Sequence, residues 1–145
     1  MRITDNLKND IEDAPKWFHK SLNIIPEELL IKNDRGDLSY ARWSSTKEND
    51  NLLIFIHGTG AHKKWWYPIA PQFINDTNVI AVDLPGMGDS GFREKYSIKD
   101  FGECIISIIE TEQRNNNISN ISIIGHSLGG QVGAYVASEK KELVN

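Results

Sequence analysis

Residues 121–131, which read I-S-I-I-G-H-S-L-G-G-Q, decide how the rest of the chain is interpreted. A short apolar run bounded by glycine predicts a buried strand, and the segment after it has helical character. Between them residues 125–129 form a G-x-S-x-G motif, typical of a strained strand-to-helix turn that lifts a serine hydroxyl out of a sheet. Gly125 and Gly129 are expected to lie against neighbouring backbone, where a Cβ would clash.

The serine of this motif, Ser127, is predicted to stand at the start of the helix. Backbone N–H groups and the positive end of the helix dipole are then close by, so an oxyanion formed there would be stabilised. The alternative is a chance match in a loop. The strand before it, the helix after it and two further motifs upstream disfavour that alternative.

The size and composition of the chain fit one soluble globular domain. At 145 residues it is long enough for one hydrophobic core and too short to expect two domains. A net charge of −4 gives no electrostatic case for binding nucleic acid or an anionic membrane. No stretch approaches the roughly 18 consecutive apolar residues of a membrane span, and residues 1–13 lack the apolar run of a signal peptide. A single cysteine, Cys104, excludes an internal disulfide and fits a reducing compartment, so we expect a cytoplasmic protein.

Strand and helix patterns alternate along the chain. Residues 1–25 predict a short helix lying on the body of the domain, with Trp17, Phe18 and Leu22 at helical spacing. Two strand-like pieces then flank a turn-rich segment and predict an antiparallel hairpin. Helices are expected over residues 65–73, from a cap at Ser97 onward, and after the G-x-S-x-G motif. The expected strands are 29–32, 38–43, 52–56, 79–82 and 121–124. This order predicts an α/β fold, a mostly parallel, doubly wound sheet opened by the hairpin.

Three motifs follow consecutive parallel strands at their carboxyl ends, where open α/β sheets bind ligands. They read H-G-T-G at residues 57–60, D-L-P-G-M-G-D-S-G at 83–91 and G-H-S-L-G at 125–129. In this order they resemble the α/β-hydrolase family, and more narrowly its bacterial serine-hydrolase branch. The resemblance covers roughly residues 27–140. It implies an α/β-hydrolase core and hydrolysis of a small-molecule acyl substrate, with no cofactor.

The resemblance also implies roles for the residues that carry the chemistry. Ser127 resembles the family nucleophile, and a serine there argues against epoxide hydrolase and haloalkane dehalogenase chemistry. The backbone N–H groups of Leu128 and Thr59 match the two donors of an oxyanion hole.

Other motif residues resemble structural supports of the site. His57 and Gly58 match the residues that hold the loop at Thr59, as Gly125 and Gly129 match those that shape the turn at the serine. His126 occupies the variable position of the G-x-S-x-G motif. Neither of these histidines resembles a catalytic base.

Neighbouring polar residues have plainer interpretations. His62, Lys63 and Lys64 are expected in a solvated loop rather than in contact with substrate. Asp83 and Asp89 are expected to hold their own turn through side-chain hydrogen bonds, rather than to act as the acid of a triad. At least one of the tryptophans at 65 and 66 is expected to pack in the core. The four histidines show no ligand spacing, so no metal site is predicted.

The chain departs from the family pattern after Ser127. In the family the acid and the base follow the nucleophile along the chain. Here residues 128–145, predicted to form one helix, contain no histidine, and Glu139 and Glu142 lie at the far end of that helix. We therefore expect the N-terminal half of a hydrolase, with residues 1–26 as a helical extension and residues 27–145 as half of the domain. The later strands, the cap, the catalytic acid and the catalytic histidine are absent from this half.

Such a half would leave strand 121–124 as an uncovered apolar edge, so we expect self-association or pairing with a missing C-terminal half. Two classes of function stay open. The first is a serine hydrolase that cleaves esters, thioesters or C–C bonds through an acyl-enzyme on Ser127, with little activity from this chain alone. The second is a non-catalytic protein that uses the hydrolase scaffold to hold a ligand or a partner. Acyltransferase or lyase chemistry on the same scaffold is a third alternative.

Overall fold

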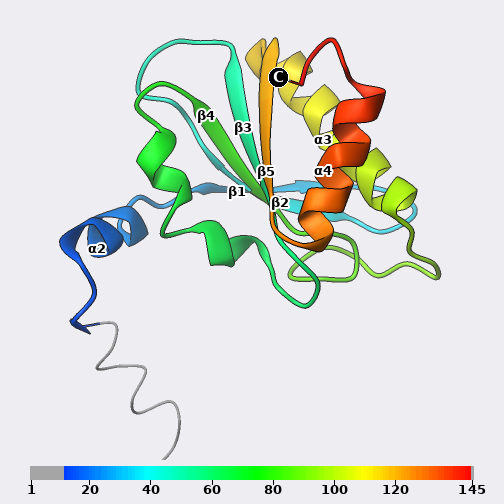
Figure 1. Ribbon diagram of the computed structural model, residues 1–145, viewed down its shortest axis with the longest axis horizontal. Coiled ribbons are helices and arrows are strands. Elements are labelled where there is room, and N and C mark those ends of the chain that lie inside the picture. Colours follow the sequence, from blue (N-terminus) through cyan, green and yellow to red (C-terminus); the bar gives the residue numbers. More distant parts are fainter. Residues whose placement is uncertain (1–11, 145) are drawn as a thin grey trace, which may run out of the picture.

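The computed structural model describes residues 12–144, which form a five-stranded sheet with helical segments on both faces (Figure 1). The part of the expected N-terminal helix that falls on residues 1–11 lies outside the described residues. Within 12–144, no helix is long and apolar enough to span a membrane. In chain order the elements are α2 (Lys16–Leu22), β1 (Glu27–Ile31), β2 (Leu38–Trp43), β3 (Asn51–Ile56), the 3-10 helices η1 (Lys63–Trp66) and η2 (Ala70–Phe73), β4 (Asn78–Val82), α3 (Ile98–Asn116), β5 (Asn120–Gly125) and α4 (Leu128–Glu139).

The strands lie in the order β1-β2-β4-β3-β5. β1 and β2 form an antiparallel hairpin, and β2 also pairs antiparallel with β4. β4, β3 and β5 run parallel to one another, so their carboxyl ends meet at one edge of the sheet. The predicted architecture, an α/β-hydrolase core in which a hairpin leads into parallel strands, is confirmed.

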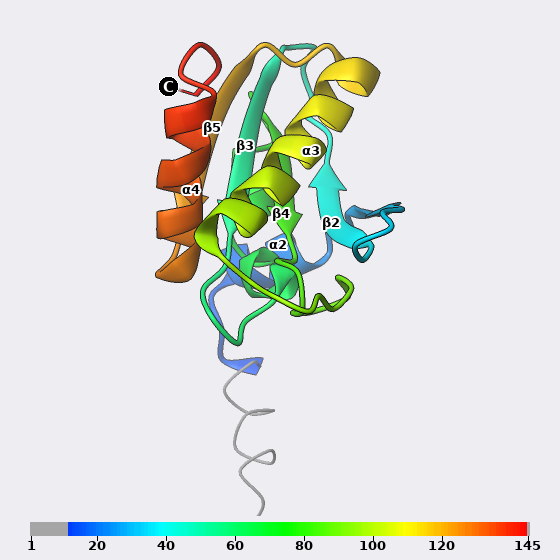
Figure 2. The ribbon, with the colours of Figure 1, turned by 90° about the vertical axis from the view of Figure 1, so that its right-hand side faces the viewer.

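Alternating side chains divide the core between the two faces of the sheet. In β3, Leu52, Ile54 and Ile56 belong to the apolar cluster that includes α3 and α4, whereas Leu53 and Phe55 pack with residues of η1 and η2. Figure 2 shows α3 crossing in front of β3 and β4, with α4 lying along β5. Every residue of β4 is buried, as expected of a strand that is covered on both faces.

The helix α3 begins and packs as its sequence predicts. The N–H of Asp100 donates to Ser97 Oγ at 3.1 Å, which satisfies one of the free donors of the first turn. The buried face of the helix includes Phe101, Ile105 and Ile108. The helix therefore presents an apolar side to β3 and β4.

One prediction about a helix is wrong and another holds for the described residues. The segment 65–73 is not one helix but the two short 3-10 helices η1 and η2, because Pro68 and Pro71 lack the N–H that a continuous α-helix needs. The short helix predicted within residues 1–25 is present as α2, although Trp17 and Leu22, which stand at helical spacing, are 48% and 44% exposed. The buried residue of this two-turn helix is Ser21, whose Oγ accepts a hydrogen bond from Gln72 of η2.

The segment after Ser127 is also not one helix to its end. α4 stops at Glu139, and residues 140–144 turn back toward the sheet. The N–H of Ile121 donates to the Leu143 carbonyl at 2.9 Å, and Val144 forms a single parallel bridge with Ile121. This turn covers only the beginning of β5. The rest of β5 is the outer edge of the described sheet, where Ile124 is 41% exposed.

Candidate active site

The three sequence motifs meet where the parallel strands β3, β4 and β5 end. Loop 57–60 follows β3, loop 83–91 follows β4, and residues 125–129 join β5 to α4. The Leu84 N–H donates to Nε2 of His57 at 3.1 Å, and the His126 N–H donates to the Ile56 carbonyl at 3.0 Å. The loop after β3 is therefore bonded to the loop after β4, and the last residue of β3 is bonded to the turn that carries the serine.

Ser127 lies at the junction of β5 and α4, where it is the exposed N-cap residue of the helix. Its backbone has φ 52° and ψ −115°, one of two positive φ values among the described non-glycine residues. A sparsely populated conformation of this kind costs about 1–3 kcal/mol, which the surrounding packing must offset. Within residues 12–144, Ser127 Oγ makes no side-chain cap hydrogen bond to its own helix. The hydroxyl is thus held out at the carboxyl edge of the sheet, where the sequence predicted it.

Two glycines make this sharp turn sterically possible. A Cβ on Gly125 would lie 2.3 Å from the Gly129 carbonyl oxygen, and a Cβ on Gly129 would lie 2.3 Å from the Ile56 carbonyl oxygen. Both distances are far below an ordinary contact between heavy atoms. The predicted close approach of Gly125 and Gly129 to neighbouring backbone is therefore observed, and it presses the start of α4 onto the end of β3.

Gly58 brings the loop after β3 against the serine. A Cβ at Gly58 would lie 3.2 Å from Ser127 Cβ and 2.8 Å from His126 Nδ1. The next residue, Thr59, is exposed and Leu128 is half-buried. Among residues 12–144, neither the Thr59 nor the Leu128 N–H donates a hydrogen bond to a protein acceptor. Neither amide therefore has a hydrogen-bond acceptor within the described part of the chain.

His57 is a fully buried link between two loops rather than a group facing the serine. Because the Leu84 N–H donates to Nε2, the ring proton is assigned to Nδ1, which donates to the Gly58 carbonyl at 2.8 Å. Burial lowers the pKa of His57, against the opposing effects of the Gly58 carbonyl and the Asp83 carboxylate. The imidazole is therefore neutral at pH 7 and bonds the loop that carries Thr59 to the loop after β4.

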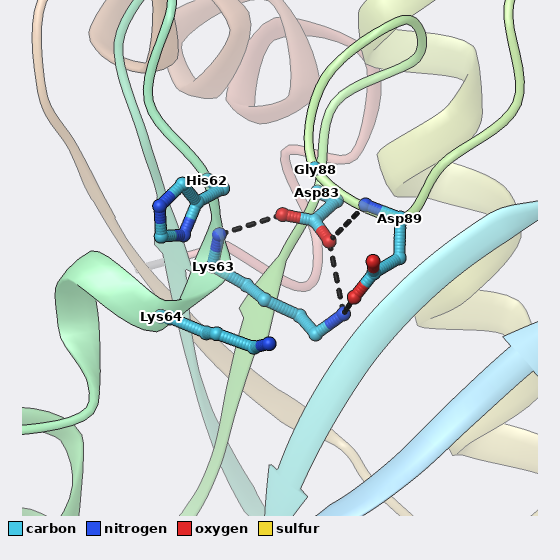
Figure 3. A pocket seen from close by; sticks show the side chains of 6 residues that line it. All are labelled: His62, Lys63, Lys64, Asp83, Gly88 and Asp89. Carbon is cyan, nitrogen blue, oxygen red and sulfur yellow. Dashed lines mark hydrogen bonds and ion pairs between the residues drawn. The ribbon is translucent and has the colours of Figure 1, made fainter.

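The expectation that Lys63 is solvated is wrong. Its side chain is only 1% exposed and lies in a charged cluster beside a cavity of about 220 Å³ (Figure 3). Its Nζ donates to Asp83 at 2.9 Å, to Asp89 at 2.6 Å and to Ser39 Oγ at 2.7 Å. Burial alone would lower the pKa of Lys63, but the hydrogen bonds to Asp89 and Asp83 outweigh it and raise the pKa. Sequence inspection missed this residue because its carboxylate partners are distant along the chain.

The two aspartates do more than hold their own turn. Asp83 accepts the Asp89 N–H at 2.9 Å, as the turn prediction requires, but it also accepts the Lys63 N–H at 2.6 Å. The Lys63 ammonium holds the pKa of Asp89 below its ordinary value. His62 and Lys64, by contrast, are exposed as predicted, and both line the same cavity.

Of the two tryptophans in η1, one packs against the sheet and the other is exposed. Trp66 is half-buried and packs against the apolar cluster of Leu53 and Phe55, with its ring centroid 4.8 Å from that of Phe55. Trp65 is 52% exposed and meets the His126 ring edge-on at 4.9 Å. Trp65 and His126 therefore form an exposed aromatic pair, and His126 directly precedes Ser127.

No metal site is formed by the side chains of the described residues. Within 12–144, no group of three or more His, Cys, Asp or Glu side chains is placed to hold a metal ion. No histidine of the sequence follows Ser127, and Glu139 is the last residue of α4, at the opposite end of the helix from the serine.

The sequence profile of the α/β hydrolase fold matches residues 51–145. The chain belongs to the α/β hydrolase fold family. This α/β-hydrolase chain is 31% identical over 122 residues to the (E)-2-((N-methylformamido)methylene)succinate hydrolase of Acinetobacter baylyi, covering 83% of the chain and 43% of that protein. It is 33% identical over 87 residues to a pimeloyl-acyl-carrier-protein methyl ester esterase of Pseudoalteromonas atlantica, covering 59% of the chain and 31% of the esterase.

Solved structures agree on the fold. The thioesterase domain from the curacin biosynthetic pathway superimposes with a TM-score of 0.69 at 23% identity, over 82% of this chain and 43% of that domain. The α/β-hydrolase chain thus spans less than half the length of each of these three proteins. The predicted family is confirmed, and the catalytic roles of Ser127, Thr59 and Leu128 stay predictions.

Proposed function

We propose that this chain carries the nucleophile and the oxyanion donors of a serine hydrolase that cleaves carboxylic esters, thioesters or C–C bonds through an acyl-enzyme. The observation that supports this most strongly is Ser127 itself, exposed at a positive φ between β5 and α4, with Gly58 packed against its Cβ. The two relatives described above, a hydrolase and a methyl ester esterase, favour the same class of reaction.

In this reaction Ser127 Oγ attacks the carbonyl carbon of the substrate, and the carbonyl oxygen becomes an oxyanion. The Thr59 and Leu128 N–H groups, which have no acceptor among residues 12–144, donate to that oxygen. Each donor of this kind lowers the barrier by about 3 kcal/mol. Collapse of the tetrahedral intermediate expels the leaving group and leaves an acyl group on Ser127, which water then removes.

A serine hydroxyl is a weak nucleophile until a base removes its proton. His57 is buried and bonded on both ring nitrogens, so it does not serve as that base. The catalytic acid and base are proposed to lie outside these 145 residues, so the chain alone is expected to hydrolyse esters slowly. Oxyanion donors without a complete triad still accelerate hydrolysis by roughly 10³ over water in other serine hydrolases, so the expected rate is low rather than zero.

The test supplies the missing base from solution. The chain is incubated with p-nitrophenyl acetate at roughly pH 9–10, and the acetylated residues are located by peptide mass spectrometry. We expect Ser127 to be acetylated faster than Ser138, an exposed serine on the same helix. The Ser127→Ala chain should lack this rapid acetylation while its lysines react as before. Equal rates at Ser127 and Ser138 would overturn the proposed function.

A further inference from the structure

The loop that carries Thr59 is bonded to its neighbour at both ends, and its exposed middle follows Gly58, which packs against the turn at Ser127. At one end, the His57 ring is bonded to the Leu84 N–H. At the other, Lys63 is bonded to Asp83. Both attachment points lie in the loop after β4. Between them Thr59 and Gly60 are exposed, and a Cβ on Gly60 would meet no heavy atom of the described chain within 4 Å.

The attachment at Lys63 uses both its backbone and its side chain. Asp83 Oδ1 accepts the Lys63 N–H at 2.6 Å, and Asp83 Oδ2 accepts from Nζ at 2.9 Å (Figure 3). Asp83 is itself only 1% exposed, and Gly88 folds over its carboxylate so closely that a Cβ there would lie 2.2 Å from Oδ1. The carboxylate therefore fixes the Lys63 backbone from a position that cannot easily shift.

The lysine charge makes this attachment stable. An ammonium group has three N–H donors, and here each has an acceptor: Asp83, Asp89 and Ser39. A third carboxylate, Glu28 of β1, lies 3.3 Å from Nζ. Without the cation, the buried Asp83 carboxylate would face two further negative charges in surroundings where an unpaired charge is costly.

We propose that Lys63 and Asp83 are positioning residues that hold the Thr59 N–H in place beside Ser127. This role rests on the function proposed above, because it matters only if Thr59 donates to an oxyanion. Since Thr59 itself is exposed, its place depends on its neighbours in the loop: Gly58, packed against Ser127, and the two attachments at His57 and Lys63. A misplacement of about 1 Å in a catalytic group can cost on the order of 10²-fold in rate, so loss of the Lys63 attachment is expected to weaken the Thr59 donor.

The experiment separates the oxyanion donors from the missing base. In a Ser127→Cys chain the introduced thiol ionises without a neighbouring base. With p-nitrophenyl acetate, a C–S bond forms, the C–O bond to p-nitrophenolate breaks, and an oxyanion develops on the way. With iodoacetamide, the same thiolate displaces iodide and no oxyanion forms. The ratio of the acylation rate to the alkylation rate therefore reports the oxyanion donors and cancels the reactivity of the thiolate. The buried thiol of Cys104 is measured separately in the chain that retains Ser127.

In the Ser127→Cys background, Lys63→Met should lower this ratio by roughly 10- to 100-fold, the range expected for weakening one oxyanion donor. Lys63→Arg keeps the cation and should restore much of the ratio. The matched control is Lys64→Met, which removes the same charge from an exposed neighbour in the same cavity and should leave the ratio unchanged. If Lys63→Met does not fold, Asp83→Asn, which keeps an oxygen for the Lys63 N–H, is expected to lower the ratio by a smaller factor.

An unchanged ratio in both Lys63→Met and Asp83→Asn would overturn the positioning role while leaving the proposed function intact. A ratio in the Ser127→Cys parent no higher than that of glutathione would instead show that no oxyanion donors act, and would overturn both.

Discussion

Replacing Gly129 by alanine should strongly destabilise the protein, whereas replacing its neighbour Gly130 should not. A Cβ on Gly129 would lie 2.3 Å from the Ile56 carbonyl oxygen and 2.7 Å from the His57 carbonyl oxygen, roughly 1 Å short of ordinary contacts. Both obstacles are backbone atoms, so no side-chain rotation relieves them, and α4 must move away from β3. At Gly130 the nearest atom outside the adjacent helix backbone, the Gly125 carbonyl oxygen, is 3.4 Å away, an ordinary contact.

The two substitutions share the same helix-propensity gain of about 1 kcal/mol, so their difference isolates the clash. Overpacking costs about 1–3 kcal/mol and occasionally more, and a clash with fixed backbone belongs at the upper end. We therefore expect Gly129→Ala to lower the free energy of unfolding by about 2 kcal/mol, and Gly130→Ala to raise it by about 0.5–1 kcal/mol. Urea unfolding at equal m-values measures both. Equal stabilities of the two variants would refute the close packing of α4 on β3 that places Ser127.

Three further outcomes are expected. Burial lowers the pKa of His57, so the unfolded chain binds its proton first; stability is complete above roughly pH 6.5 and should fall by up to about 1.4 kcal/mol per pH unit below it. Urea unfolding midpoints at pH 7.5 and 5.5 check this, and the His57→Asn variant should lose less stability between these two pH values. An equal loss in the variant and the parent chain would contradict it. Glu112 is 1% exposed and accepts hydrogen bonds from Tyr40 and Arg42, so Glu112→Ala should lower the free energy of unfolding in urea by about 3–5 kcal/mol, and Glu112→Gln should lower it less. A loss below about 1 kcal/mol in Glu112→Ala would contradict a stabilising role of these hydrogen bonds. The open edge of β5 should make the chain self-associate as concentration rises, and Ile124→Lys should suppress this; light scattering that finds only monomer for the parent chain would contradict it.

Much of the fold follows from local patterns that the sequence displays. The strand before Ser127 is apolar and bounded by glycine. The G-x-S-x-G motif places a glycine at both positions where the turn approaches neighbouring backbone. Gly125 lies against Gly129, four residues later, so this contact is local, whereas Gly129 lies against the distant Ile56 and His57 carbonyls, and its close approach could be predicted only because the motif is typical of a tight strand-to-helix turn. The fold class, a mostly parallel sheet opened by a hairpin, followed from the alternation of strand and helix patterns together with the resemblance to the family.

The features that could not be predicted depend on partners far along the chain. Lys63 stands between His62 and Lys64 and looks solvated, yet folding brings Asp83, twenty residues later, against both its backbone and its side chain. The return of residues 140–144 to β5 likewise depends on a bond between Leu143 and Ile121. In neither case does the hydrophobic pattern of the segment reveal the partner.

The most direct test of the central claim is a crystal structure of the chain with a phenylboronic acid. The claim is that Ser127, Thr59 and Leu128 form one site for a tetrahedral oxyanion. Boron is expected on Ser127 Oγ, with one boronate oxygen about 3 Å from both the Thr59 and the Leu128 nitrogen atoms. A boronate bound elsewhere, or one on Ser127 whose oxygens face solvent while the Thr59 N–H points away, would contradict the claim.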